Sequence, residues 1–159
     1  MKKILLSSAV ILVTLTGCQS TPEYSCDNDA VKTTALDIVR DSFNTNMANN
    51  FSGIKDALAL EALVRKRDGQ ITDYQVNTDY ENIEFSLSNV RTTEQDKELG
   101  NYQCAATLTG SKEGIDRDVV VDIEYTAEAV DSGENFYVEV VGLTYEKLGR
   151  FAFLLLDYY

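Results

Sequence analysis

The sequence contains no histidine among its 159 residues. Histidine is the most common general base in enzymes and the most common zinc ligand, so its absence excludes Ser-His-Asp and Cys-His catalytic sites and removes the usual zinc site. The sequence also lacks a glycine-rich phosphate-binding loop and a closely spaced pair of cysteines. These absences predict a protein that is not an enzyme and that holds no cofactor or metal.

The first apolar run is too short for a transmembrane helix, which needs about 20 residues. It extends from Ile4 to Leu15, follows the basic start Met1-Lys2-Lys3, and is followed by Gly17-Cys18. A short basic segment, a short apolar segment and small residues at a cleavage site are typical of a secretory signal peptide. We therefore expect this run to direct export and then to be removed.

The end of this run carries a more specific motif. Leu15-Thr16-Gly17-Cys18 resembles the lipobox of bacterial lipoproteins, in which a leucine stands three residues before an invariant cysteine. The resemblance implies that the Cys18 thiol receives a diacylglyceryl group, that the leader 1–17 is cleaved, and that the new amino terminus is acylated with a fatty acid such as palmitate. Residues 18–25, with the only proline at Pro22, then form the lipidated terminus and a tether. Several acyl chains attach a protein firmly, because each buried methylene contributes about 0.8 kcal/mol.

The residue after the lipobox cysteine is Gln19. In enterobacterial lipoproteins an aspartate at this position is a retention signal for the inner membrane. The resemblance therefore implies the outer membrane, with the domain facing the periplasm, in preference to the inner membrane.

Acidic residues outnumber basic ones by 26 to 14, and the formal net charge is −12. Cleavage would remove Lys2 and Lys3 and leave a net charge of about −14. A strong negative charge repels nucleic acid and attracts cationic partners. One expectation is therefore that the protein binds a cationic envelope protein. A simpler interpretation is that the acidity keeps the domain soluble.

Cys26 and Cys104 are the two cysteines that the lipid does not use. An even pair in an oxidising compartment predicts a disulfide, which would tie the start of the domain to a central strand. A buried free thiol and an intermolecular bridge are the alternatives.

The first part of the domain has helical periodicity. Asp27, Asn28 and Asp29 provide a helix cap and first-turn acidic residues, and the apolar residues that follow predict a helix over about 29–47. The polar stretch 44–50 predicts a frayed end or a turn. Ser52 can cap a second helix, which ends in the basic cluster 65–67 before Gly69.

After residue 70 the period changes to two. Four segments alternate apolar and polar residues, which predicts strands around 83–88, 102–109, 119–126 and 136–141. Short turns between them imply an antiparallel meander. We expect a single α+β domain over 26–159, in which the N-terminal helical segment packs on a four-stranded antiparallel meander. This layout resembles that of cystatin-like folds.

The C-terminal segment 147–159 is strongly apolar. One interpretation is that it docks into the core, and the other is that it is exposed and binds a partner or the membrane surface. The candidate partner-binding residues under the second interpretation are Phe151, Phe153, Leu155, Tyr158 and Tyr159.

Three functions from different classes follow. The leading expectation is a lipid-anchored, non-enzymatic binding or structural module of the cell envelope that faces the periplasm. The first alternative is an inhibitor or immunity lipoprotein against a cationic hydrolase or toxin, which the net charge favours. The second is a carboxylate-dependent glycan hydrolase, which requires two close carboxylates in a cleft. Glu84, Asp122, Glu124 and Glu139 stand on the polar faces of strands, where a solvated sheet surface would place them.

Overall fold

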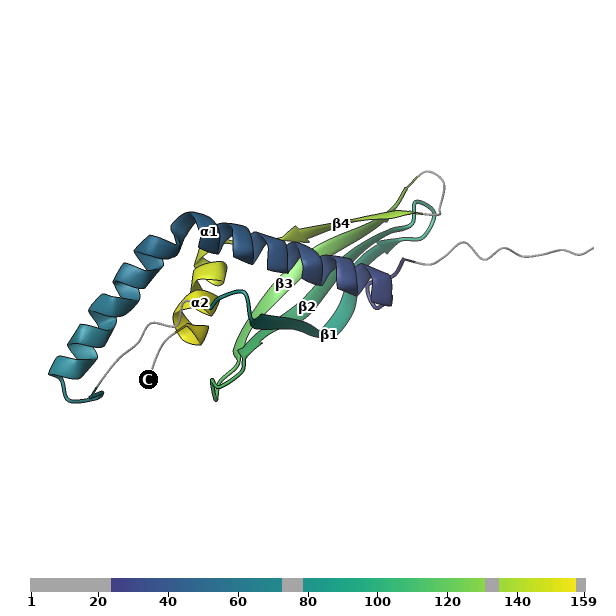
Figure 1. Cartoon of the computed structure of the whole chain (residues 1–159). Coiled ribbons are helices and arrows are strands. Elements are labelled where there is room, and N and C mark those ends of the chain that lie inside the picture. Colours follow the sequence, from purple (N-terminus) through teal and green to yellow (C-terminus); the bar gives the residue numbers. More distant parts are fainter. Residues whose placement is uncertain (1–23, 73–78, 131–134, 157–159) are drawn as a thin grey trace, which may run out of the picture.

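The computed structural model describes residues 24–72, 79–130 and 135–156, and it has the predicted α+β architecture (Figure 1). One long helix is followed by four strands and a short helix. The elements are α1 (Asp29–Arg67), β1 (Ile83–Asp96), β2 (Asn101–Lys112), β3 (Val119–Ala129), β4 (Phe136–Val141) and α2 (Tyr145–Leu155). None of the helices in these ranges combines the length and the apolar character that crossing a bilayer requires.

The helix α1 begins where the sequence predicts. The side chain of Asn28 accepts hydrogen bonds from the backbone N–H groups of Ala30 and Val31, at 2.9 and 3.4 Å. These bonds satisfy two of the free donors at a helix start. The helix ends before Gly69, whose φ of +72° favours glycine.

The predicted break in this helix is wrong, because α1 is one continuous helix of 39 residues. Asparagine disfavours a helix by only about 0.7 kcal/mol relative to alanine. Phe43 and Met47 are fully buried beneath the polar stretch, and their burial outweighs that preference. Ser52, predicted to cap a second helix, lies inside α1 instead. Figure 1 shows that the helix changes direction in its middle and continues past the sheet.

The four strands form an antiparallel meander in the order β1-β2-β3-β4, as predicted. Burial alternates along β3, where Val119, Val121, Ile123 and Tyr125 are buried and the residues between them are exposed or partly exposed. The strand β1 extends further than its apolar pattern, to Asp96, after an irregularity in its pairing beyond Ser88. Asn89 has a positive φ of 50° at this point.

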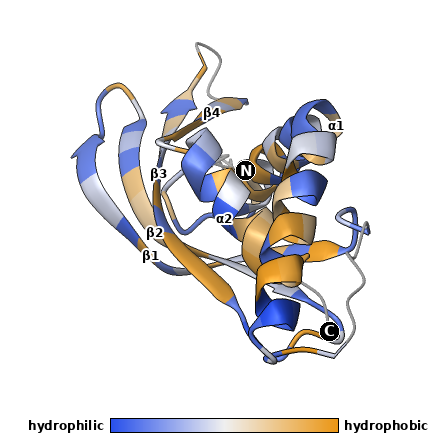
Figure 2. Ribbon diagram, turned by 90° about the vertical axis from the view of Figure 1, so that its left-hand side faces the viewer, coloured by the Kyte–Doolittle hydropathy of each residue, from blue (hydrophilic) through white to orange (hydrophobic). Residues whose placement is uncertain are grey.

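The core lies between the inner face of the sheet and the two helices, where apolar residues gather in Figure 2. A row of aromatic rings joins the layers: Phe43 on α1 packs edge-on against Phe85 on β1, and Phe85 packs likewise against Phe151 on α2. The ring centroids are 5.4 and 5.3 Å apart. The close approach of α2 requires Gly110, because a Cβ at this position would lie 2.6 Å from the Phe151 ring.

Candidate functional site

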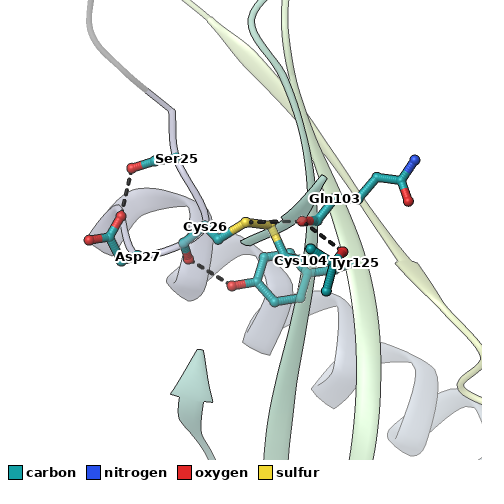
Figure 3. The surroundings of a disulfide bond; sticks show 7 residues. Ser25, Cys26, Asp27, Gln103, Cys104 and Tyr125 are labelled. Carbon is teal, nitrogen blue, oxygen red and sulfur yellow. Dashed lines mark hydrogen bonds between the residues drawn. A yellow bond between two sulfur atoms is a disulfide. The ribbon is translucent and has the colours of Figure 1, made fainter. Parts of the chain in front are cut away.

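The predicted disulfide between Cys26 and Cys104 is confirmed, with a Cα–Cα distance of 5.6 Å (Figure 3). It joins the segment before α1 to β2, across 78 positions of the sequence. Tyr24 strengthens the same junction, since its ring packs 4.7 Å from that of Phe136 on β4. The chain that leads in from the lipid attachment site is therefore held firmly to the sheet.

Tyr125 on β3 also contributes to this junction. Its hydroxyl donates a 2.7 Å hydrogen bond to the backbone carbonyl of Cys26, as Figure 3 shows. Burial of the phenol, with a smaller contribution from the negative charge of Asp27, raises the pKa of Tyr125 to about 12. A hydrogen bond from Ser25 lowers the pKa of Asp27 itself. We regard the junction as structural, because the Tyr125 hydroxyl and the Asp27 carboxylate already form hydrogen bonds with Cys26 and Ser25.

A groove with a volume of about 790 Å³ lies between α1 and the start of α2. One wall is a polar row on a single face of α1, made by Asp41, Ser42, Thr45, Asn46, Asn49 and Asn50. The other wall follows β4 and is made by Leu143, Thr144, Tyr145 and Leu148. At about 1.5 Å per residue, this row begins about 18 Å from the first residue of α1 and continues to about 32 Å.

The polar row and its surroundings contain four asparagines, a residue type that a helix interior disfavours. Asn44, Asn46, Asn49 and Asn50 stand in the middle of α1, and each has a helix preference up to about 0.7 kcal/mol poorer than that of alanine. The four together cost roughly 2 to 3 kcal/mol of helix stability on that scale. Departures from local preference concentrate at functional sites. Three of the four asparagines line the groove, and we therefore take the groove as the candidate site.

Asn46 is the most deeply placed polar residue of the row, with 7% of its surface exposed. Its backbone carbonyl accepts a 3.0 Å hydrogen bond from the Asn50 amide. In the described part of the chain, no hydrogen bond to the Asn46 side-chain amide is found. Solvent reaches this amide, because among the described residues the buried side-chain atom without a hydrogen-bond partner is Thr126 Oγ1 and not an atom of Asn46. The Asn46 side chain can therefore form hydrogen bonds with a water or a ligand in the groove.

The second wall depends on how α2 begins. The hydroxyl of Thr144 caps α2 by accepting a hydrogen bond from the backbone N–H of Lys147, and the side chain of Lys147 donates to the carbonyl of Asp122 on β3. These bonds hold Tyr145 at the first position of the helix, where it is 79% exposed. The residues that line this groove form no motif that could be recognised in the sequence. The available signal was the run of asparagines within an otherwise helical pattern.

The apolar C-terminal segment forms α2 and docks into the core. Phe151 and Leu155, two candidate partner-binding residues, are completely buried, so their assignment to a partner surface is wrong. The sheet and α1 already cover them, as the first of the two interpretations predicted. Phe153 is exposed and stays a candidate. Cys18, Tyr158 and Tyr159 lie outside the described residues.

The carboxylates of the sheet are spread over its outer face. Glu84, Asp122, Glu124 and Glu139 are all exposed, as the alternation of the strands predicts. In the ranges that the structure describes, no three histidine, cysteine or carboxylate side chains gather as a metal ion would require. Within the groove, Asp41 is the single carboxylate among the lining residues described above.

A larger hollow of about 1180 Å³ lies at the edge of β1. Its lining includes two basic and four acidic side chains. Lys112 is buried there, and its ammonium donates to the backbone carbonyl of Asp79. Burial lowers the pKa of Lys112. Both basic side chains of this hollow have partners within the protein, since Arg40 pairs with Asp37 and Lys112 donates to Asp79, which makes it a weaker candidate than the groove.

In comparisons with known proteins, the start of the chain matches one family model. Residues 1–19 match the prokaryotic membrane lipoprotein lipid attachment site. This match confirms the resemblance of the Leu15-Thr16-Gly17-Cys18 motif and covers none of the folded domain. No curated protein and no solved structure matches the chain.

Proposed function

We propose that this bacterial lipoprotein, anchored to a membrane through lipid on Cys18, is a non-enzymatic binding module of the cell envelope. The observation that carries the proposal is the groove between α1 and α2, built at asparagines that weaken the helix. A protein keeps such residues at a cost in stability when they contribute to function. The disulfide junction then holds the domain to its lipid tether while the groove binds a component of the envelope.

The location that we propose is the outer membrane, with the domain facing the periplasm. The support is Gln19, which stands where enterobacterial inner-membrane lipoproteins carry aspartate. Membrane fractionation of cells that produce the full chain tests this proposal. We expect the wild type in the outer membrane and Gln19→Asp in the inner membrane, and the same distribution for both would contradict the sorting argument.

The binding proposal is tested by capture from envelope extract with the chain from Gln19 onward. Asn49→Arg places a long charged side chain in the groove and should abolish capture of the bound component. Ala48→Arg is the matched control, since Ala48 is exposed on the same helix and is not a lining residue of the groove. Equal capture by all three proteins would reject the groove as the binding site.

A second candidate function is inhibition of a cationic hydrolase. Its support is the exposed outer face of the sheet, where Asp122 and Glu124 lie on β3 and Glu139 lies on the neighbouring strand β4, opposite Thr126. The triple variant Asp122→Asn, Glu124→Gln, Glu139→Gln removes this charge. We expect it to lose salt-sensitive binding of a basic lysozyme if the face is the inhibitory surface, and unchanged binding would reject that surface.

The hydrolase alternative has less support from the groove. A glycoside hydrolase of the common type places two carboxyl groups about 5 to 10 Å apart, whereas Asp41 is the only carboxylate in the two walls described above. Incubation with glycans followed by product analysis tests it. Cleavage that is lost in Asp41→Asn would contradict the non-enzymatic proposal.

A further inference from the structure

We infer that the groove between α1 and α2 binds a neutral glycan chain, an inference that rests on the proposed binding function. The inference concerns the chemical class of the ligand. It follows from the hydrogen-bonding groups of the groove, from its charge and from the position of its one exposed aromatic ring.

The polar wall presents groups that both donate and accept hydrogen bonds. The amides of Asn46, Asn49 and Asn50 and the hydroxyls of Ser42 and Thr45 have this property. Sugar hydroxyl groups also donate and accept, and they are spaced along a ring, so a row of such side chains matches a row of hydroxyls. Asn46 is the least exposed residue of this row, with 7% of its surface exposed, and its side-chain amide has no hydrogen bond within the described part of the chain.

The charge of the groove disfavours other ligand classes. Asp41 is the only charged side chain in its two walls, and the whole chain carries a net charge of −12. Phosphates and nucleic acids would be repelled, and one carboxylate is too few for a resident cation. Leu143 and Leu148 are the only aliphatic residues of the lining, too few to enclose a lipid chain.

Tyr145 provides the remaining element of a sugar site. Its side chain is 79% exposed at the first position of α2, and the residue lines the groove. The aromatic ring offers an apolar face against which the C–H groups of a sugar ring can pack. The groove volume of about 790 Å³ lies within the range of about 300 to 1,000 Å³ that is usual for small-ligand sites. A groove open to solvent suits a segment of a chain.

Isothermal titration with tetra-N-acetylchitotetraose tests the inference. We expect Asn49→Ala and Tyr145→Ala each to raise Kd about fivefold to tenfold, the loss of one good contact. The matched controls are Asn44→Ala, a substitution in the same helix outside the groove, and Tyr137→Ala, at an exposed tyrosine on β4. Both controls should keep the wild-type Kd.

A thermal scan of the same proteins separates binding from folding. Asn49→Ala should raise the melting temperature, because alanine is the better helix former, while it weakens binding. A misfolded variant would lose both. Weaker binding in a more stable protein therefore assigns Asn49 to the ligand rather than to the fold.

The outcomes distinguish this inference from the function on which it rests. If Asn49→Arg abolishes envelope capture and the wild type does not bind the tetramer or purified neutral polysaccharides, the glycan class is rejected and the binding function stands. If the wild type captures nothing through the groove and binds no glycan, both are rejected. Where the tetramer binds, competition with purified sacculi or with neutral polysaccharide released from the outer membrane identifies the source, and competition by either one supports the inference.

Discussion

The two halves of α1 have similar apolar content but very different surroundings. In the first half, 29–49, the apolar residues form one stripe that packs on the sheet, and Val31, Val39, Phe43 and Met47 are buried. In the second half, 50–67, Leu58 and Ala62 are buried, whereas Leu60, Leu63 and Val64 are 65%, 54% and 41% exposed. Figure 1 shows why, because the second half extends past the sheet.

This difference shows that the stability of the helix comes mainly from the first half. A helix in water is marginal unless an apolar face packs against other elements. The groove lies where the two halves meet, since its polar row spans positions 41 to 50. The asparagines therefore lie where the burial of Phe43 and Met47 can offset the loss of helix stability that they cause.

The sharpest test of the comparison is one truncation in each half. Phe43→Ala should lower the free energy of unfolding by about 3 to 5 kcal/mol, because the ring is buried against Phe85. Leu60→Ala should change it by less than about 0.5 kcal/mol, because Leu60 is mostly exposed. Urea denaturation measures both. Similar losses would show that the second half is packed as firmly as the first.

Removal of the disulfide tests how much the stability of the domain depends on the attachment of the start of α1 to β2. The double variant Cys26→Ala, Cys104→Ala should lose about 2 to 4 kcal/mol, since the bond closes a long loop in the unfolded chain. Chemical denaturation of the double variant and the wild type measures the loss. A negligible change would mean that Tyr24 and Tyr125 hold the junction without the disulfide.

Two glycines test the docking of α2 on the sheet. Gly110→Ala should lower the free energy of unfolding by about 1 to 3 kcal/mol, because the new methyl group would overlap Phe151. The displaced α2 should also weaken ligand binding in the groove. Gly149→Ala is the control within α2, where a Cβ meets nothing within 4 Å and should stabilise the helix by up to about 1 kcal/mol. Thermal scans compare the two. Equal stability of the two variants would contradict the described packing.

The pH dependence of stability tests the burial of Tyr125 at the disulfide junction that precedes α1. The pKa of Tyr125 is raised to about 12 in the folded protein, whereas in the unfolded chain it is near 10. The unfolded state therefore loses this proton first, and folding stability falls as the pH rises from about 10 to 12. The difference in unfolding free energy between wild type and Tyr125→Phe should be about 1 kcal/mol near neutral pH and should shrink over that interval. A constant difference would contradict the burial of the phenol.

The smallest effect belongs to Asn44, beside the groove. Asn44→Ala should raise stability by about 0.5 kcal/mol, because it removes a poor helix former at a half-buried position. A denaturation midpoint measured with replicates resolves this change. A loss of stability instead would show that the Asn44 side chain contributes to the fold.

Much of the fold follows from local patterns. Alternation predicted the four strands and their buried faces, and the cap at Asn28 predicted the start of α1. The pairing of Cys26 with Cys104 followed by elimination. Two assignments failed because they depend on distant residues: the break expected at 44–50, and the exposure considered for Phe151 and Leu155. The candidate groove was missed for the same reason, since its walls come from residues 41–50 and 143–148, which are far apart in the chain.

The lipid attachment site, the predominantly acidic charge and the change from helical to strand periodicity can all be read directly from the order of the residues. Each is a property of neighbouring residues. In contrast, the continuation of α1 through its asparagines and the groove between the polar row and Tyr145 depend on packing between distant segments. The physical reason is one of magnitude: burying Phe43, Met47 and Phe151 between layers contributes several kcal/mol, whereas the local preference against each asparagine is below about 1 kcal/mol.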